Sequence, residues 1–179
     1  RCPKLELLPE LPSCTKLNCF DCPNLESLPD LPLCIKLWCS NCPKLESLPD
    51  LPLCIWLNCS NCPKLESLPD LPNCIELRCY CCKKLEILPD LPVCNYLNCY
   101  SCPKLDSLPE LSLCIELDCS YCPNITYIAN KDIDFIHYEK TPIAGINQEL
   151  YLQHINNIKI IIDKSFGANQ IPGVVDIMV

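Results

Sequence analysis

Glycine is almost missing from this chain: there are only 3 among 179 residues, and none lies before residue 145. A glycine-rich loop that cradles a phosphate therefore has no place in the first 144 residues. Histidine is equally scarce, and neither His137 nor His154 is paired with a nucleophile. The carboxylates simply recur with the repeat described below. These absences predict a protein that is not an enzyme.

Clusters of positive charge and long apolar runs are missing as well. The formal net charge is −8 and the largest basic run is Lys83–Lys84, so the basic surface that nucleic acids require is absent. No apolar run approaches the ~20 residues that span a bilayer, and even Ile158–Ile162 is interrupted by Lys159. We therefore expect neither nucleic-acid binding nor membrane insertion.

Cysteine and proline are abundant instead, with 20 and 19 copies, and every cysteine lies at or before position 122. Residues 28–47 return as residues 48–67 with only Lys36 and Trp38 replaced, and near copies continue on both sides at a fixed period of 20 residues. Apart from Cys81, the cysteines form three series in this register. The entry cysteines are Cys14, Cys34, Cys54, Cys74, Cys94 and Cys114; the exit cysteines are Cys19, Cys39, Cys59, Cys79, Cys99 and Cys119; the loop cysteines are Cys2, Cys22, Cys42, Cys62, Cys82, Cys102 and Cys122.

Within one unit, apolar residues follow one another in steps of three, with a single step of two between Leu37 and Cys39. The step of two predicts a short strand over Leu37-Trp38-Cys39, because alternate side chains of a strand face opposite sides. The steps of three suit extended or polyproline-like segments, and the prolines fix φ there. A single coil of this kind cannot bury its apolar edge, so the repeat predicts stacked coils with parallel strands.

These residues resemble a known family. The stretch Cys34-Ile-Lys-Leu-Trp-Cys-Ser-Asn-Cys-Pro-Lys-Leu45 is similar to the leucine-rich-repeat core L-x-x-L-x-L-x-x-[N/C]-x-x-L. The Leu-Pro-Asp-Leu-Pro segments resemble the 20-residue class of bacterial effectors, Cys-Pro-Lys-Leu-Glu resembles plant resistance-type repeats, and the cysteine-rich array resembles repeat proteins of giant amoebal viruses. The resemblance implies an α/β solenoid: a right-handed coil with short parallel strands and extended convex segments. The chain departs from the family by placing cysteine at the entry and exit positions.

The pattern decays after Cys122. We expect a solenoid over residues 1–128 and, over 129–179, a degenerate last repeat with a strand near 133–138 followed by a C-terminal cap. Apolar residues at mainly three-to-five spacing predict an amphipathic cap helix near 146–164, which Gly167 follows. A partner-binding helix is the alternative for that segment.

If Leu37 and Cys39 point inward, positions 36 and 38 and their copies point outward on the concave strand face. These positions vary most between units and carry aromatic and arginine side chains, which often anchor interfaces. The expected partner-binding residues are Lys36, Trp38, Trp56, Arg78, Tyr80, Tyr96 and Tyr100. We therefore predict a protein-binding scaffold without a cofactor. The alternative for the aromatics is plain cross-strand stacking.

The cysteines allow three interpretations. They can be reduced core thiols, with the loop cysteines donating S–H to adjoining backbone. They can instead bind metal, because stacked C-x-x-C pairs have the spacing of four-thiolate zinc sites and [4Fe–4S] clusters are allowed by ligand type. The alternative function is thus a metalloprotein with sites built from Cys19, Cys22, Cys39, Cys42, Cys59, Cys62, Cys79, Cys82, Cys99, Cys102, Cys119 and Cys122.

Disulfides are the third interpretation, supported by the even number of cysteines and by sequons at Asn58 and Asn124. In-register stacking places each cysteine beside its own copies, where the geometry of a disulfide is awkward. We expect few disulfides, and mainly reduced thiols would indicate an intracellular compartment. Cys81 lies outside the three series near Lys83, and we expect it to face solvent and to be the best candidate for a reactive or intermolecular thiol.

Overall fold

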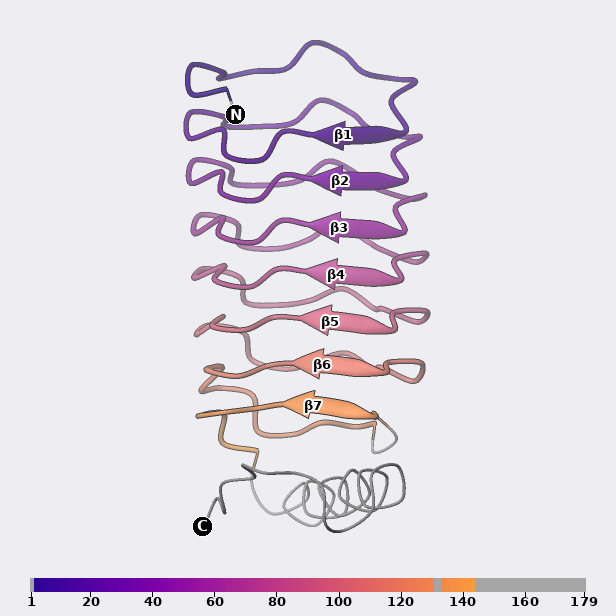
Figure 1. Ribbon diagram of the computed structural model, residues 1–179, viewed down its shortest axis with the longest axis vertical. Coiled ribbons are helices and arrows are strands. Elements are labelled where there is room, and N and C mark those ends of the chain that lie inside the picture. Colours follow the sequence, from indigo (N-terminus) through magenta and orange to yellow (C-terminus); the bar gives the residue numbers. More distant parts are fainter. Residues whose placement is uncertain (1, 131–132, 144–179) are drawn as a thin grey trace, which may run out of the picture. The chain divides into compact units, whose positions relative to one another are not determined.

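The computed structural model describes residues 2–130 and 133–143, which form a solenoid of stacked coils (Figure 1). Each coil contributes one short strand, and the strands lie side by side in the order of the chain. They are β1 (Lys16–Asn18), β2 (Lys36–Trp38), β3 (Trp56–Asn58), β4 (Glu76–Arg78), β5 (Tyr96–Asn98), β6 (Glu116–Asp118) and β7 (Phe135–His137). All neighbours are parallel and in register, so that Leu17 pairs with Leu37 and Leu37 with Leu57. The predicted parallel-strand solenoid is confirmed.

The strands begin one residue earlier than the sequence predicted. The second strand covers Lys36–Trp38, whereas the spacing indicated residues 37–39. Cys39 still takes part in the ladder, since its N–H donates to Asn58 O at 2.9 Å. Asn41 then adopts the left-handed conformation with φ of 58°, which turns the chain away from the sheet.

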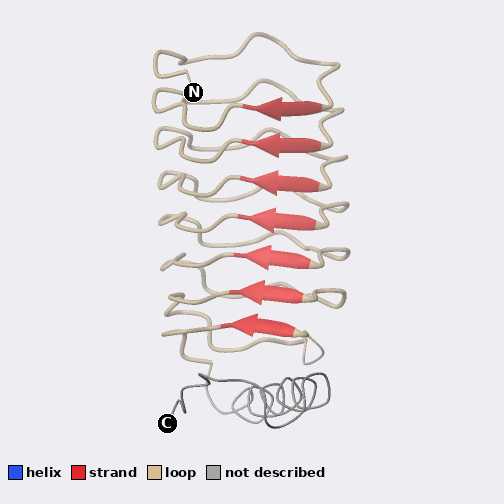
Figure 2. Ribbon diagram, viewed as in Figure 1, coloured by secondary structure: helices blue, strands red, loops and turns tan. Residues whose placement is uncertain are grey.

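The remainder of each coil consists of extended segments and tight turns (Figure 2). One turn closes where Cys34 N donates to Leu31 O at 3.1 Å, and another where Leu45 N donates to Cys42 O at 3.1 Å. The described residues contain no helix, and so none that is long and apolar enough to cross a membrane. The predicted cap helix near 146–164 lies outside the described residues, and β7 lies within the predicted last repeat.

The core is a column of leucine and cysteine side chains between the sheet and the extended segments. Leu37, Cys39 and Leu45 are fully buried, and their equivalents in the following coils, through Leu117, Cys119 and Ile125, are buried too. Burying a leucine side chain stabilises the fold by about 2–3 kcal/mol, and each coil buries leucines only because its neighbours cover them. The repeat therefore sets both the register of the strands and the stability of the stack.

Exposed ion pairs tie successive coils together on the segment that follows the loop cysteine. Lys64 Nζ lies 2.7 Å from Glu46 Oε1, and Lys84 Nζ lies 2.7 Å from Glu66 Oε1. Lys104 and Glu86 repeat the contact at 2.8 Å. Such exposed pairs contribute less than about 1 kcal/mol each, so this Lys–Glu ladder is a solvated surface rather than the source of stability.

Candidate functional site

The exposed face of the sheet carries the predicted partner-binding residues. In β2 to β6 the central residue is buried and the two flanking residues are half-buried. This confirms that positions 36 and 38 of each unit point away from the core. All seven predicted side chains are half-buried, five of them on strands and two just past a strand: Lys36, Trp38, Trp56, Arg78, Tyr80, Tyr96 and Tyr100.

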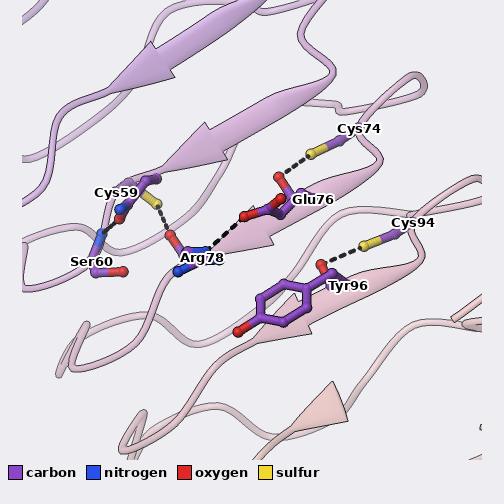
Figure 3. A network of polar contacts seen from close by, with 8 residues as sticks. Cys59, Ser60, Cys74, Glu76, Arg78, Cys94 and Tyr96 are labelled. Carbon is purple, nitrogen blue, oxygen red and sulfur yellow. Dashed lines mark hydrogen bonds and ion pairs between the residues drawn. The ribbon is translucent and has the colours of Figure 1, made fainter. Parts of the chain in front are cut away.

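Side chains on neighbouring strands of this face contact one another diagonally. The rings of Trp38 on β2 and Trp56 on β3 have centroids 4.7 Å apart and are tilted by 42°. Arg78 on β4 lies over the ring of Tyr96 on β5, with its guanidinium carbon 4.9 Å from the centroid. Arg78 Nε also lies 2.7 Å from Glu76 Oε1, as Figure 3 shows. The face therefore presents a pair of tryptophan rings and an arginine whose side chain is oriented by contacts with Glu76 and Tyr96.

The side chains that lie two residues after the end of each strand differ in burial. Ser60 and Ser120 are buried, whereas Phe20 remains 42% exposed. Tyr100 contacts Tyr121, with ring centroids 5.2 Å apart, and Lys140 Nζ lies 4.8 Å above the Tyr121 ring. Tyr121 was not among the predicted binding residues. Its signal was an aromatic residue at a position that holds Asp, Asn, Cys or Ser in the earlier coils.

The loop cysteines donate hydrogen bonds to the backbone of the preceding coil. Cys62 Sγ lies 3.2 Å from Cys39 O, and Cys102 Sγ lies 3.1 Å from Cys79 O. The contact recurs at Cys42, Cys82 and Cys122. Each thiol thus satisfies a buried carbonyl oxygen of an exit cysteine. The expectation that the loop cysteines bond to adjoining backbone is confirmed.

The entry cysteines also act as donors, within their own coil. Cys74 Sγ lies 3.3 Å from Glu76 O and Cys94 Sγ lies 3.2 Å from Tyr96 O (Figure 3). The same contact occurs in the other units, at Cys14, Cys34, Cys54 and Cys114. The acceptor in each case is the carbonyl of the first strand residue, so the thiol fixes the bend by which the chain enters the strand.

The exit cysteines lie deepest, and burial keeps their thiols protonated. Burial raises the pKa of Cys39 well above the usual 9.0, and in Cys19 burial raises it to about 12. The pKa of Cys59 is raised by a hydrogen bond with the Cys82 thiol and by burial. Attack on an electrophile needs the thiolate, so these buried thiols are poor nucleophiles and pack in the core as small apolar side chains do.

The predicted four-cysteine metal sites are not assembled in the structure. Across residues 2–130 and 133–143, no group of three or more Cys, His, Asp or Glu side chains is placed to hold a metal ion. Cys39 and Cys42 of one C-x-x-C pair serve different purposes: Cys39 packs in the core, while Cys42 donates to Cys19 O at 3.3 Å. The metalloprotein alternative stays a prediction, and the metal content of anaerobically purified protein tests it.

Cys81 does not have the surroundings of an activated thiol. It is half-buried, and burial, together with the nearby Cys102, raises its pKa. Lys83 acts in the opposite direction but is a lesser influence. The structure therefore gives no support to the expected reactivity of Cys81. None of the 20 cysteines forms a disulfide in the structure.

Comparison with protein-family models, with curated proteins and with solved structures finds no match for this chain. Its function must therefore be argued from its own geometry. Two features stand out: the varied, half-exposed face of the sheet, and an interior whose thiols satisfy backbone carbonyls.

Proposed function

We propose that this chain is a non-catalytic scaffold of the leucine-rich-repeat type, which binds a partner protein through the exposed face of its sheet. The observation that carries the proposal is the grouping of Trp38, Trp56 and Arg78 on that face. Tryptophan, tyrosine and arginine are the residue types enriched among energetic hot spots of interfaces. The rest of each unit is repeated almost unchanged, so these positions distinguish one coil from the next.

The arrangement of Arg78 supports binding more than it supports stability. Its side chain is 40% exposed, and Glu76 and Tyr96 hold it in one orientation. An arginine that is already ordered loses less conformational entropy when a partner docks on it. The tryptophan pair offers an aromatic, apolar surface on the neighbouring strands β2 and β3.

Reduced thiols support an intracellular location for this function. Every cysteine is a free thiol, and most are buried. Disulfides form and persist in oxidising compartments, whereas a reducing one keeps such a core intact.

A matched pair of variants tests the proposal. In the first, Trp38, Trp56 and Arg78 are changed to Ala; in the second, Lys64, Lys84 and Lys104 of the Lys–Glu ladder are changed to Ala. The wild-type chain and both variants are each used as bait in a lysate of the source cells, and the captured proteins are quantified by mass spectrometry. We expect a specific partner to be lost from the first variant and kept by the second, with both variants folded by circular dichroism. Equal capture by all three proteins would reject the proposal.

A further inference from the structure

The residues on either side of each entry cysteine form two rows along the edge of the sheet where the strands begin. The row before the entry cysteines consists of Leu33, Leu53, Asn73, Val93 and Leu113. The row after them consists of Ile35, Ile55, Ile75, Asn95 and Ile115. The first row lies in the turn that precedes each strand, and the second row lies in the bend directly before the strand. Neither row was among the predicted site residues.

Apart from Leu33, the residues of the two rows line an open groove of about 760 Å³, which we call the edge groove; it extends from Ile35 to Ile115. Several of its aliphatic side chains are unusually exposed: Leu113 is 59% exposed, Leu53 is 44% exposed and Ile75 is 41% exposed. Isolated apolar residues on a surface need no explanation, but a continuous aliphatic surface indicates a binding site.

One aspartate per coil precedes the first aliphatic row of the edge groove by three residues in the sequence. Asp30, Asp50, Asp70 and Asp90 are exposed, and each lies just before the turn whose tip carries the first aliphatic row. That turn is tight, with Cys74 N donating to Leu71 O at 3.2 Å, for example. Within the described part of the chain, none of these aspartates forms an ion pair, unlike the glutamates of the Lys–Glu ladder. These four coils therefore each carry an exposed carboxylate without an ion-pair partner among the described residues, three residues before the first aliphatic row.

The edge groove also contains two side-chain amides, those of Asn73 and Asn95. The Asn73 side chain donates to Pro52 O at 2.8 Å, which fixes it in the turn. The Asn95 side chain, which replaces an isoleucine of the second row, has no hydrogen-bond partner among the described residues. A polar group within an apolar groove orients a ligand by bonding to it.

The spacing of the coils decides which backbone fits the groove. Neighbouring coils lie about 4.8 Å apart, so the distance from Ile35 to Ile115 is about 19 Å. An α-helix laid along the stack advances about 5.4 Å per turn, so each turn can place one side chain near each coil, and about 13 residues cover the groove. A β-strand presents the same side only every ~6.8 Å and falls out of step with the coils.

We propose that the edge groove binds one amphipathic, basic α-helix of a partner protein, laid along the axis of the solenoid. Its aliphatic face packs on the two rows, and lysine or arginine side chains at one edge of that face pair with the aspartates. This is the helix-in-groove mode of recognition. The edge groove is separate from the exposed face of the sheet, so the two proposals stand or fall independently.

The probe is a fluorescent, helix-stabilised peptide of about 14 residues with one leucine per turn and lysines flanking the leucine stripe. Its binding to the full chain is followed by fluorescence anisotropy. We expect saturable binding that weakens as salt is added. An isomer of the same composition, with its leucines spread around the helix, should bind at least about tenfold more weakly, because it has no continuous apolar face.

Variants locate the site. Ile75→Asp should weaken binding by about 30-fold or more, because it places a charge in the apolar contact; Ile75→Ala, a safer change for folding, should weaken it several-fold. Asp70→Asn with Asp90→Asn should weaken binding about fivefold, which is in the range of exposed ion pairs. The matched control, Glu46→Gln with Glu66→Gln, changes the net charge equally but lies on the Lys–Glu ladder and should have less than about a twofold effect.

Three results would overturn the proposal. The isomer could bind as well as the amphipathic peptide, or both pairs of charge variants could weaken binding equally; either would show non-specific attraction to an acidic protein. Sedimentation could instead reveal a dimer that Ile75→Asp dissociates, which would make a second copy of this chain the occupant. None of these readouts uses Trp38 or Arg78, so failure here is distinguishable from failure of the proposed sheet-face function.

Discussion

Cys122 ends the last coil that contains cysteine, and Thr141 occupies the equivalent place in the next coil. Cys122 Sγ lies 3.1 Å from Cys99 O, whereas the Thr141 hydroxyl donates to Cys119 O at 2.6 Å. The Thr141 oxygen also accepts from Cys122 N at 3.1 Å. A hydroxyl therefore performs the structural task of the thiol. The loop position requires a donor to a buried carbonyl rather than sulfur as such.

The entry and exit positions also accept residues other than cysteine. Because Phe135 pairs with Glu116, Ile133 corresponds to the entry cysteine Cys114 and Tyr138 to the exit cysteine Cys119. Ile133 is buried, with 4% of its surface exposed. An aliphatic or aromatic side chain thus serves where other coils use cysteine. The comparison favours packing and hydrogen bonding over metal chemistry as the reason for the thiols in the coils up to residue 122.

Alkaline pH should have the largest effect, because it ionises thiols, which only the coils up to residue 122 contain. Below about pH 8 the thiols are protonated in both the folded and the unfolded chain, and pH has no effect through them. Above the ordinary pKa of 9.0 the unfolded thiols lose protons, while burial raises the pKa of Cys54 to about 11 and that of Cys94 to about 12. Each such thiol then lowers the free energy of unfolding by up to about 1.4 kcal/mol per pH unit. We expect the urea midpoint, measured by circular dichroism in reducing buffer, to be constant near neutrality and to fall steeply above about pH 9.

The control removes two of these thiols. In the variant Cys54→Val with Cys94→Val, the fall of the unfolding free energy above pH 9 should be shallower by up to about 2.8 kcal/mol per pH unit. Its stability at neutral pH is a separate quantity and does not enter the test. An unchanged slope would show that lysine or tyrosine titration, and not the buried thiols, causes alkaline unfolding.

Substitution of a loop cysteine should have the next largest effect. Cys102→Ala leaves the buried Cys79 carbonyl without its donor and opens a small cavity, so we expect a loss of about 2–4 kcal/mol in the free energy of unfolding. Cys102→Ser restores a hydroxyl donor and should cost less than about 1.5 kcal/mol. Thr141→Ala should resemble the first change and Thr141→Ser the second. Urea unfolding in reducing buffer measures all four, and equal losses for Ala and Ser would contradict the role assigned to the donor.

The repeat made much of the fold predictable, because a fixed period of 20 residues leaves stacked, in-register coils as the arrangement that buries the leucines. The outward direction of positions 36 and 38 followed from the two-residue period of a strand. Other details of the side chains did not follow from the period. The diagonal pairing of Trp38 with Trp56, the bond from Cys74 to Glu76 O and the exposure of Leu113 depend on side-chain rotamers and on the path of each bend. Periodicity encodes neither.

The smallest expected effect concerns a backbone feature that the coils with cysteine share with the last coil, which has none. From Asp21 onward, the residue before each loop position is left-handed, with φ of 58° at Asn41, 59° at Cys81 and 54° at Lys140. Asn tolerates this conformation better than other residues that carry a Cβ. Cys81→Asn should therefore stabilise the chain by about 0.5–1 kcal/mol, and Asn41→Ala should destabilise it by about 1 kcal/mol. Both changes keep the backbone N–H that donates to the next coil, at 2.8 Å from Cys81 to Tyr100 O. Urea midpoints for the two variants should move in opposite directions; a shift of both in the same direction would show that the side chains, and not the left-handed backbone, determine the preference at this position.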